Sequence, residues 1–500
     1  MKRAVPIFLA MLLLIPLISC SSEESASNPK NDAPESAAPE PDAETADPTL
    51  DENGFKKDAL PEGLSLGGST VTFYVRGDTL ESEFINENTG EVLEDALYFR
   101  DLNVEERLDA NLEYFANTSA DFWGERNLYM DTVRAAVMSA DGSMDIVAGL
   151  SIMMPIMARE GLFYNLLGDK IQYMDFEKPW WPANMIEEMA IKDRLYFASG
   201  EASLGVIKGA ICMFFNNGLI ADYDLENPYD LVFSGEWTID KWNEMASGVY
   251  TDTNGNGIED NDDTVGFFIQ NENQAPNFFS AAGILLAERN EDGFPELKCK
   301  TERFVNFMER IVSYMKQPGF TSDRDDEDVF SDMFNTGRAL FATGEFGNLE
   351  KMREVEFVFG TIPFPKYDSA QENYGSSTRS TFSGLGIPKC GNAEFADLIL
   401  EAFSSESYRT VSPAYYEIAM KDKYSRDSVS AQMYDMIKAG VRYDFAIINA
   451  QIMADVNPTI LTRRQICREL DNWISTWEAS EKVFTTNIEA YFDDILALEE

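Results

Sequence analysis

The chain has 500 residues, of which 44% are hydrophobic and 12% aromatic, enough apolar surface for two or three domains. Its formal net charge of -47 argues against binding to nucleic acid and against a basic membrane-surface patch, because both need clustered Lys and Arg. Histidine is absent, which excludes Ser-His-Asp and Cys-His catalysis, histidine metal sites and histidine pH switches, but not catalysis by paired carboxylates.

The first twenty residues have the pattern of an export segment. A basic start, Met1-Lys2-Arg3, precedes an apolar run over residues 4–17 that is too short to span a membrane. The stretch Leu17-Ile18-Ser19-Cys20 resembles the bacterial lipobox, in which the cysteine sulfur carries a lipid. We therefore expect a signal peptide over residues 1–20 and a lipid on Cys20 that anchors the protein to the extracytoplasmic face of the cell membrane. The alternative is an ordinary cleaved signal peptide with an incidental cysteine.

Residues 21–66 are rich in Ser, Ala, Pro, Glu and Asp and contain few large apolar side chains. Such a composition cannot bury enough surface to fold. We expect this segment to be a disordered acidic tether between the membrane and the folded body.

From residue 67 onward, strand and helix patterns alternate, which predicts parallel sheets covered by helices on both faces. In such sheets ligands bind beyond the carboxyl ends of the strands, near Arg76, Gly77 and Asp78 and near residues 149–151. The predicted strands are residues 71–75, 111–115, 145–149, 195–198, 211–216, 265–269, 339–342 and 357–362. The predicted helices are residues 92–108, 126–139, 151–159, 278–287, 302–315 and 328–335, one that opens within 236–242, and most of the chain after residue 388.

The acidic loop at residues 252–263 matches the spacing of a calcium-binding loop. Oxygen-bearing side chains fall at positions 1, 3, 5, 9 and 12, and glycine falls at position 6. Position 12 is Asp instead of the usual Glu, and the loop leads into a strand, so we expect an isolated structural Ca²⁺ site instead of a helix-loop-helix pair. The alternative is a solvated Asn/Gly turn. The predicted ligands are Asp252, Asn254, Asn256, Asp260, Asp263 and the main-chain carbonyl of Ile258.

Several aromatic and charged residues are candidates for ligand contact. Trp180 and Trp181 lie between two prolines and could form a platform for sugar faces, although core packing is the commoner role of tryptophan. Asp78, Glu201, Glu345 and Arg379 lie beside small residues near strand ends and could hydrogen-bond hydroxyls or a carboxylate; each could equally be a solvated loop charge. Two carboxylates in one cleft could hydrolyse a glycosidic bond, but spacing in the sequence does not bring any pair together.

Five cysteines are present, and four remain if Cys20 carries a lipid. Cys212, Cys299, Cys390 and Cys467 are far apart in the chain and form no CxxC motif. Export would permit disulfides, but the spacing favours buried free thiols.

An ordered set of motifs resembles the extracellular solute-binding proteins of bacterial ABC sugar importers, family 1 type. No single motif is decisive, and the set spans most of residues 70–390. It comprises Cys20, residues 95–100 with 104–108, residues 179–181, residues 195–200, residues 226–231 with 237–238, the calcium-like loop, and residues 360–368 with Gln371 and Tyr374.

The resemblance implies a periplasmic-binding-protein-like type II α/β fold, in which two α/β lobes joined by a multi-strand hinge close on a ligand. Lobe 1 would comprise residues 67–205 with 340–388, and lobe 2 residues 206–339 with 389–500. It also implies ligand contacts between the lobes, from Asp78, Trp180, Trp181, Glu201, Trp237, Glu345, Tyr374 and Arg379.

The function implied is capture of a carbohydrate, expected to be an oligosaccharide, and its delivery to the permease subunits of an ABC importer. The protein is expected to be a monomer and not an enzyme. Two alternatives stay open: an extracellular carbohydrate-active enzyme that uses paired Asp and Glu, and a ligand-sensing binding protein for a membrane kinase.

Overall fold

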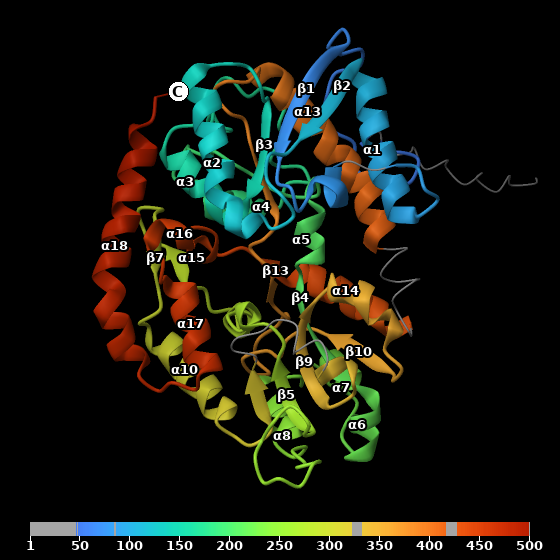
Figure 1. The fold of residues 1–500 in the computed structure, drawn as a ribbon, viewed down its shortest axis with the longest axis vertical. Coiled ribbons are helices and arrows are strands. Elements are labelled where there is room, and N and C mark those ends of the chain that lie inside the picture. The colour runs from blue at the N-terminus through green and yellow to red at the C-terminus, as the bar shows by residue number, and fades with distance from the viewer. Residues whose placement is uncertain (1–46, 48, 85–86, 323–332, 417–427, 500) are drawn as a thin grey trace, which may run out of the picture. The chain divides into compact units, whose positions relative to one another are not determined.

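The computed structural model describes residues 47, 49–84, 87–322, 333–416 and 428–499. Two main sheets organise these residues (Figure 1). The predicted signal peptide, Cys20 and most of the predicted tether lie outside the described residues. Within the described part of the chain, no helix combines the length and the apolar character needed to cross a bilayer.

The first sheet has the strand order β12-β3-β1-β2. β1 pairs in parallel with both β2 and β3, and β12 closes the sheet antiparallel to β3. All five residues of β3 are buried, as expected for a strand with helices on both faces. The strands are β1 (Ser69–Val75), β2 (Ala110–Phe115), β3 (Ile146–Leu150) and β12 (Ser383–Gly386).

The second sheet has the strand order β10-β4-β9-β5-β8. β5 is parallel to β8 and β9, whereas β4 lies antiparallel between β9 and β10. The apolar run Ile211–Asn216 is buried along its whole length because it occupies an interior position of this sheet. The strands are β4 (Ile211–Asn216), β5 (Val265–Ile269), β8 (Phe320–Ser322), β9 (Ala339–Glu345) and β10 (Phe359–Ile362).

Helices cover these sheets, and several begin at a side-chain cap. The Thr238, Thr301 and Asn392 side chains accept hydrogen bonds from main-chain amides in the first turns of α8, α10 and α13. The longer helices are α1 (Val92–Leu108), α2 (Phe122–Ser139), α8 (Ile239–Ala246), α10 (Glu302–Met315), α13 (Ala393–Glu406), α14 (Ser428–Gly440), α17 (Pro458–Cys467) and α18 (Trp473–Ala497). The shorter ones include α3 (Met154–Arg159), α4 (Ala183–Met189), α5 (Leu204–Lys208), α6 (Asn217–Asp222), α7 (Pro228–Ser234), α9 (Asn277–Ala281), α12 (Asn348–Lys351), α15 (Phe445–Ile448) and α16 (Ala450–Met453).

Three stretches of chain run between the two sheets, and we call them the crossing segments: residues 204–211, 376–383 and 438–443. The first leads through α5 into β4, and the second leads from β11 (Ser376–Ser377) into β12. The third leads from α14 through β13 (Val441–Arg442), which pairs in parallel with β11. In Figure 1, α5 and β13 lie between the two sheets.

α18 joins the two halves on another side, since it packs against both α10 and α3. Arg159 of α3 forms an ion pair with Asp494 at 2.6 Å near one end of α18. At the other end, Trp473 donates a hydrogen bond to the Cys299 carbonyl at 2.8 Å. The ribbon of β6 (Ala287–Arg289) and β7 (Pro295–Leu297) lies beside this helix.

Most of the predicted elements are confirmed, several to the residue, including α1, β4, β5 and α10. The predicted helix over residues 278–287 is shorter than expected, because α9 ends at Ala281 and β6 begins at Ala287. The predicted helix at 328–335 falls largely outside the described residues. The four cysteines Cys212, Cys299, Cys390 and Cys467 are free thiols, and all except the half-buried Cys390 are buried.

The predicted lobe boundaries differ from the strand pairing at two places. β9 and β10 belong to the second sheet, because β4 pairs with both of them, whereas the predicted first lobe includes residues 340–388. α13 packs against α1 and β1 of the first sheet, whereas the predicted second lobe includes residues 389–500. Pairings between segments more than a hundred residues apart leave no local pattern in the sequence.

The predicted tether also extends too far toward the folded body. Asp58 forms an ion pair with Arg107 at 2.6 Å and accepts a hydrogen bond from Ser405. Leu60 is buried in the core, and the Leu66 amide donates to the Leu108 carbonyl at 2.7 Å. These contacts anchor residues 58–66 to α1 and α13.

A buried carboxyl group on α13 makes the fold sensitive to pH. Glu401 accepts a hydrogen bond from the Trp181 indole at 2.9 Å, and burial raises its pKa to about 7. An unfolded Glu titrates near 4.5, so the folded state holds this proton more tightly. The stability that the proton supplies is complete below pH 4.5 and is lost as the pH rises through 7.

We expect the pH dependence of the free energy of unfolding to be weaker in Glu401→Gln, because this side chain cannot ionise. Between pH 4.5 and 8 the wild type should lose about 3 kcal/mol more than the variant. Urea unfolding at several pH values measures the difference, and Glu394→Gln, at an exposed position of the same helix, is the control. Parallel pH profiles for the wild type and Glu401→Gln would contradict the assignment.

Candidate functional site

The carboxyl ends of strands from both sheets point toward the crossing segments. β1 is followed by Arg76-Gly77-Asp78, and β3 is followed by Ser151, whose hydroxyl donates to the Ser380 carbonyl at 2.7 Å. In the second sheet β9 ends at Glu345, and the next amide, of Phe346, donates to the Ala210 carbonyl at 3.1 Å. In sheets of this kind ligands bind at the carboxyl ends of the strands, and in both sheets these ends lie beside the crossing segments.

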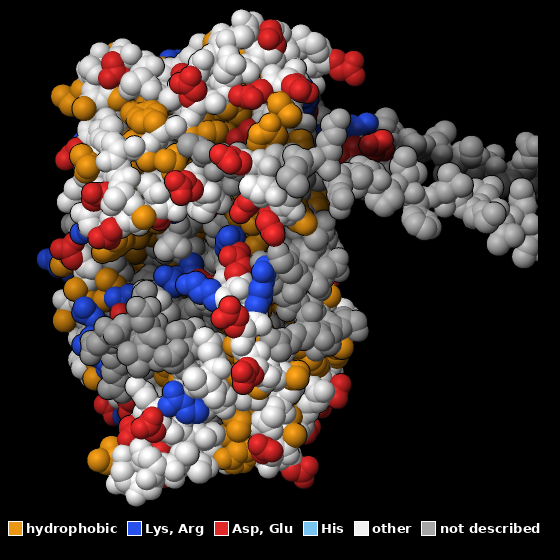
Figure 2. Space-filling model, turned by 45° about the vertical axis from the view of Figure 1, so that its right-hand side comes forward, with side chains coloured by type: hydrophobic (Ala, Val, Ile, Leu, Met, Phe, Trp, Pro, Cys, Tyr) orange, Lys and Arg blue, Asp and Glu red, His pale blue; other side chains and the backbone are white. Residues whose placement is uncertain are grey.

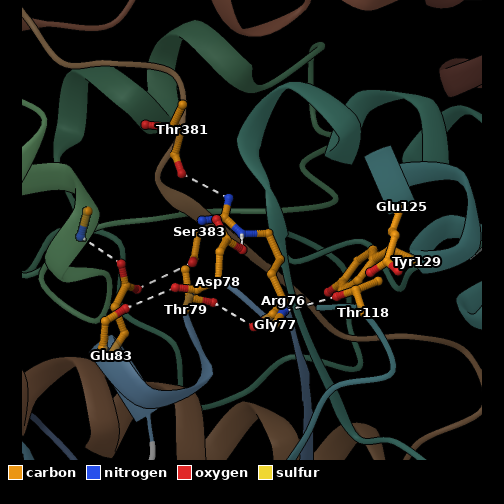
Figure 3. A network of polar contacts seen from close by, with 12 residues as sticks. Arg76, Gly77, Asp78, Thr79, Glu83, Thr118, Glu125, Tyr129, Thr381 and Ser383 are labelled. Carbon is orange, nitrogen blue, oxygen red and sulfur yellow. Dashed lines mark hydrogen bonds and ion pairs between the residues drawn. The ribbon is translucent and has the colours of Figure 1, made fainter. Parts of the chain in front are cut away.

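Glu83 holds two crossing segments against the end of the first sheet (Figure 3). It is buried on a short π-helix, Leu80–Phe84, just after β1. Its carboxyl oxygens accept hydrogen bonds from the Gly205 amide at 3.0 Å and from the Ser203 and Ser383 hydroxyls at 3.3 Å. Burial raises the pKa of Glu83, while the charge of Arg76 acts to lower it.

Arg76 ties the same edge to the second crossing segment. Its buried guanidinium donates to Asp78 at 3.1 Å and to the Thr381 carbonyl at 2.9 Å, as Figure 3 shows. It also lies 5.3 Å from the centre of the Phe122 ring. The Asp78 side chain is still 36% exposed, so its carboxylate is held in place and remains accessible to a ligand.

The other predicted charged residues lie in ion pairs beside the crossing segments. Glu345 and Arg379 approach to 3.8 Å, so the structure brings together two residues that are 34 positions apart. Glu201 lies just before the first crossing segment, and its carboxylate is 3.8 Å from the Lys438 ammonium of α14. Lys208 pairs with Glu350 at 3.0 Å. In Figure 2 a band of alternating basic and acidic side chains crosses the middle of this face.

The structure places the rings of all four predicted aromatic contacts in the core. Trp180 and Trp181 pack under α13, where the Trp181 indole donates to Glu401. Trp237 donates to the Pro363 carbonyl at 2.9 Å, and Tyr374 donates to the Val232 carbonyl at 3.1 Å. A ring without an exposed face cannot stack on a sugar, so these residues build the lobes and do not line the site.

Trp123 is a residue that the sequence reasoning missed. It is 53% exposed, whereas the other six tryptophans are buried. It is the second residue of α2, which follows β2 after a short loop. The Thr118 hydroxyl of that loop accepts a hydrogen bond from the Gly77 amide at 3.0 Å. The predicted strand at 111–115 already placed it at the ligand-binding edge, so the signal was present in the sequence.

The acidic loop at 252–263 is held by its own hydrogen bonds. Asp260 accepts from the side-chain amides of Asn254 and Asn256, which gathers three of the predicted calcium ligands. The hydrogen bond from the Asp262 main-chain amide, and then these two bonds, lower the pKa of Asp260. Asp252 accepts from the Gly255 and Gly257 amides at 2.7 and 2.9 Å. Within the described chain, no three carboxylates or thiols are grouped as a metal site. The carboxylates of Asp252 and Asp260 accept hydrogen bonds from amide groups of the loop.

Two hollows of about 320 and 480 Å³ lie along α18, away from the crossing segments. One lies between α18 and the β6–β7 ribbon, and the other lies between α10 and the start of α18. None of the predicted ligand residues lines either hollow.

No protein-family model and no curated protein matches this chain. Its fold is similar to that of a cyclo/maltodextrin-binding protein complexed with maltotetraose, with a TM-score of 0.52, 11% identity and coverage of 86% of this chain and 98% of that one. It is also similar to that of a maltose-binding periplasmic protein from Listeria monocytogenes in complex with maltose, with a TM-score of 0.50, 11% identity and coverage of 86% of this chain and 99% of that one. For the maltose-maltodextrin binding protein of Alicyclobacillus acidocaldarius the TM-score is 0.50 and the identity 12%, with coverage of 84% of this chain and 100% of that one. The expected periplasmic-binding-protein-like fold with two α/β lobes is confirmed.

Proposed function

We propose that this protein is an extracytoplasmic substrate-binding subunit that captures a carbohydrate between its two lobes and presents it to the membrane subunits of an ABC importer. The fold it shares with maltodextrin-binding proteins supports this proposal. The observation that carries it is the meeting of both sheets' carboxyl ends at the crossing segments, with Asp78, Glu345 and Arg379 at that meeting point.

The same arrangement favours binding over hydrolysis. A glycosidase needs two carboxyl groups that face one bond, with one of them protonated. Here Asp78, Glu345 and Glu201 each face a cation, namely Arg76, Arg379 and Lys438. Paired charges of this kind are suited to orienting hydroxyl groups by hydrogen bonds.

We expect an oligosaccharide to bind the full chain and to stack on Trp123. Trp123→Ala should weaken binding roughly tenfold, which corresponds to about 1.4 kcal/mol. Isothermal titration against neutral and acidic oligosaccharides, peptides and polyamines measures this. Phe233→Ala, which removes another exposed ring, on α7, should leave the affinity unchanged. If no saccharide binds while a peptide or polyamine does, the carbohydrate assignment is wrong.

We also propose that Cys20 carries the lipid that retains the protein at the membrane surface. The lipobox-like stretch supports this, and Cys20→Ser should release the protein into the soluble fraction. Intact-mass spectrometry of the membrane fraction should show a mature chain that begins at Cys20 with added lipid mass. A mature chain without that mass would contradict the proposal.

We propose in addition that the 252–263 loop binds Ca²⁺ through Asp252, Asn254, Asn256, Asp260, Asp263 and the Ile258 carbonyl. The gathering of Asn254, Asn256 and Asp260 supports it, and calcium would neutralise the charge concentrated in this loop.

Calcium at a hundred times its dissociation constant should stabilise the fold by about 2.7 kcal/mol and raise the melting temperature by several degrees. Asp260→Ala should abolish this shift. Asp262→Ala, which removes a charge from the same loop outside the predicted ligand positions, should retain it. Equal shifts in both variants, or no shift in the wild type, would refute the site.

A further inference from the structure

The crossing segments carry basic residues and no acidic ones. Residues 204–211, 376–383 and 438–443 contain Lys208, Arg379, Lys438 and Arg442 without a single Asp or Glu. Over the whole chain acidic residues outnumber basic ones by 87 to 40. The crossing segments therefore contribute only basic side chains to the place where the two sheet edges meet. The acidic groups there come from neighbouring segments and include Asp78, Glu201 and Glu345.

Main-chain pairing joins the stretches of chain that carry Lys208, Arg379 and Arg442. The Arg379 amide donates to the Gly209 carbonyl at 2.8 Å, next to Lys208. Arg442 pairs in parallel register with Ser377, two residues before Arg379. Partners in a parallel pair project to the same face, so Arg442 and Ser377 share a face of the β11–β13 ribbon.

Two of these guanidinium groups retain free hydrogen-bonding capacity. Arg442 is exposed, and within the described chain it forms no ion pair; its one hydrogen bond goes to the Val441 carbonyl at 3.2 Å. Arg379 is 17% exposed and lies 3.8 Å from Glu345, well beyond the 2.7–2.9 Å of a charge-assisted hydrogen bond. Each guanidinium carries five N–H donors.

We propose that the saccharide bound at this site is acidic, with carboxylate or sulfate groups that pair with Arg442 and Arg379. This inference rests on the function proposed above. A planar guanidinium matches a carboxylate or sulfate with two parallel hydrogen bonds, and partly buried charges are weakly screened. Acidic residues more than about 8 Å away oppose this little, because at physiological salt charges at that distance are largely screened. The nearer carboxylates of Glu345 and Glu201 already face Arg379 and Lys438.

Titration of the full chain with matched saccharides tests the proposal. The probes are a galacturonic acid oligomer, a galactose oligomer of the same length and linkage, and its sulfated form. At 150 mM salt the galacturonate or the sulfated oligomer should bind at least tenfold more tightly than the neutral one, and the better of the two identifies the anionic group. Raising the salt should reduce that preference.

Variants assign the preference to residues. Arg442→Gln and Arg379→Gln should each lower the affinity for the acidic oligomer about tenfold, and Arg442→Lys should restore part of it. Lys300→Gln, which removes a positive charge beside α18, should change nothing.

Three outcomes would overturn the proposal. Equal or tighter binding of the neutral oligomer would refute the acidic preference and leave carbohydrate binding intact. Acidic preference that survives both arginine substitutions would refute the assignment to these residues. Binding of none of the three oligomers, nor of any saccharide in the wider panel, would refute the proposed function itself.

Discussion

The site depends on one buried carboxyl group, that of Glu83. It lies on the segment that follows β1 and bonds to the start of α5 and the start of β12. Two of the three crossing segments are thereby fixed to the edge of the first sheet. A buried polar group with several partners is costly to disrupt, so this contact sets where the crossing segments pass. Arg76 reinforces it through the Thr381 carbonyl, and the charged side chains of the site lie around this framework.

Local patterns in the sequence predicted the elements well, because strand and helix periodicity records which side chains are buried. The limits of α1 and α10 follow from helical spacing, and those of β4 follow from a continuous apolar run. The partners of β4 could not be read in this way, since β9 and β10 lie more than a hundred residues further along the chain. The tether ends earlier than its composition suggests because several contacts fix its last residues: the Asp58–Arg107 ion pair, the burial of Leu60 and the hydrogen bond from the Leu66 amide to Leu108.

Prediction of the site was less successful, and the tryptophans explain why. Trp180 and Trp181 stood out by composition, but large aromatic rings are most often core residues, and these two pack beneath α13. Trp123 is not among the predicted contacts, although its place after a predicted strand is the better criterion for a ligand contact. Glu345 and Arg379, both predicted beside strand ends, lie 3.8 Å apart in the structure, whereas the place of Arg442 follows only from the pairing of its strand with β11.

The central claim is that a saccharide occupies the place where the two sheet edges meet. Hydrogen exchange of the full chain, with and without bound saccharide, tests it most directly because every backbone amide is its own probe. The account predicts slower exchange in residues 76–84, 118–123, 204–211 and 376–383 when the ligand is present. Slower exchange confined to α18 and its hollows, or unchanged exchange at the crossing segments despite saturating ligand, would contradict it.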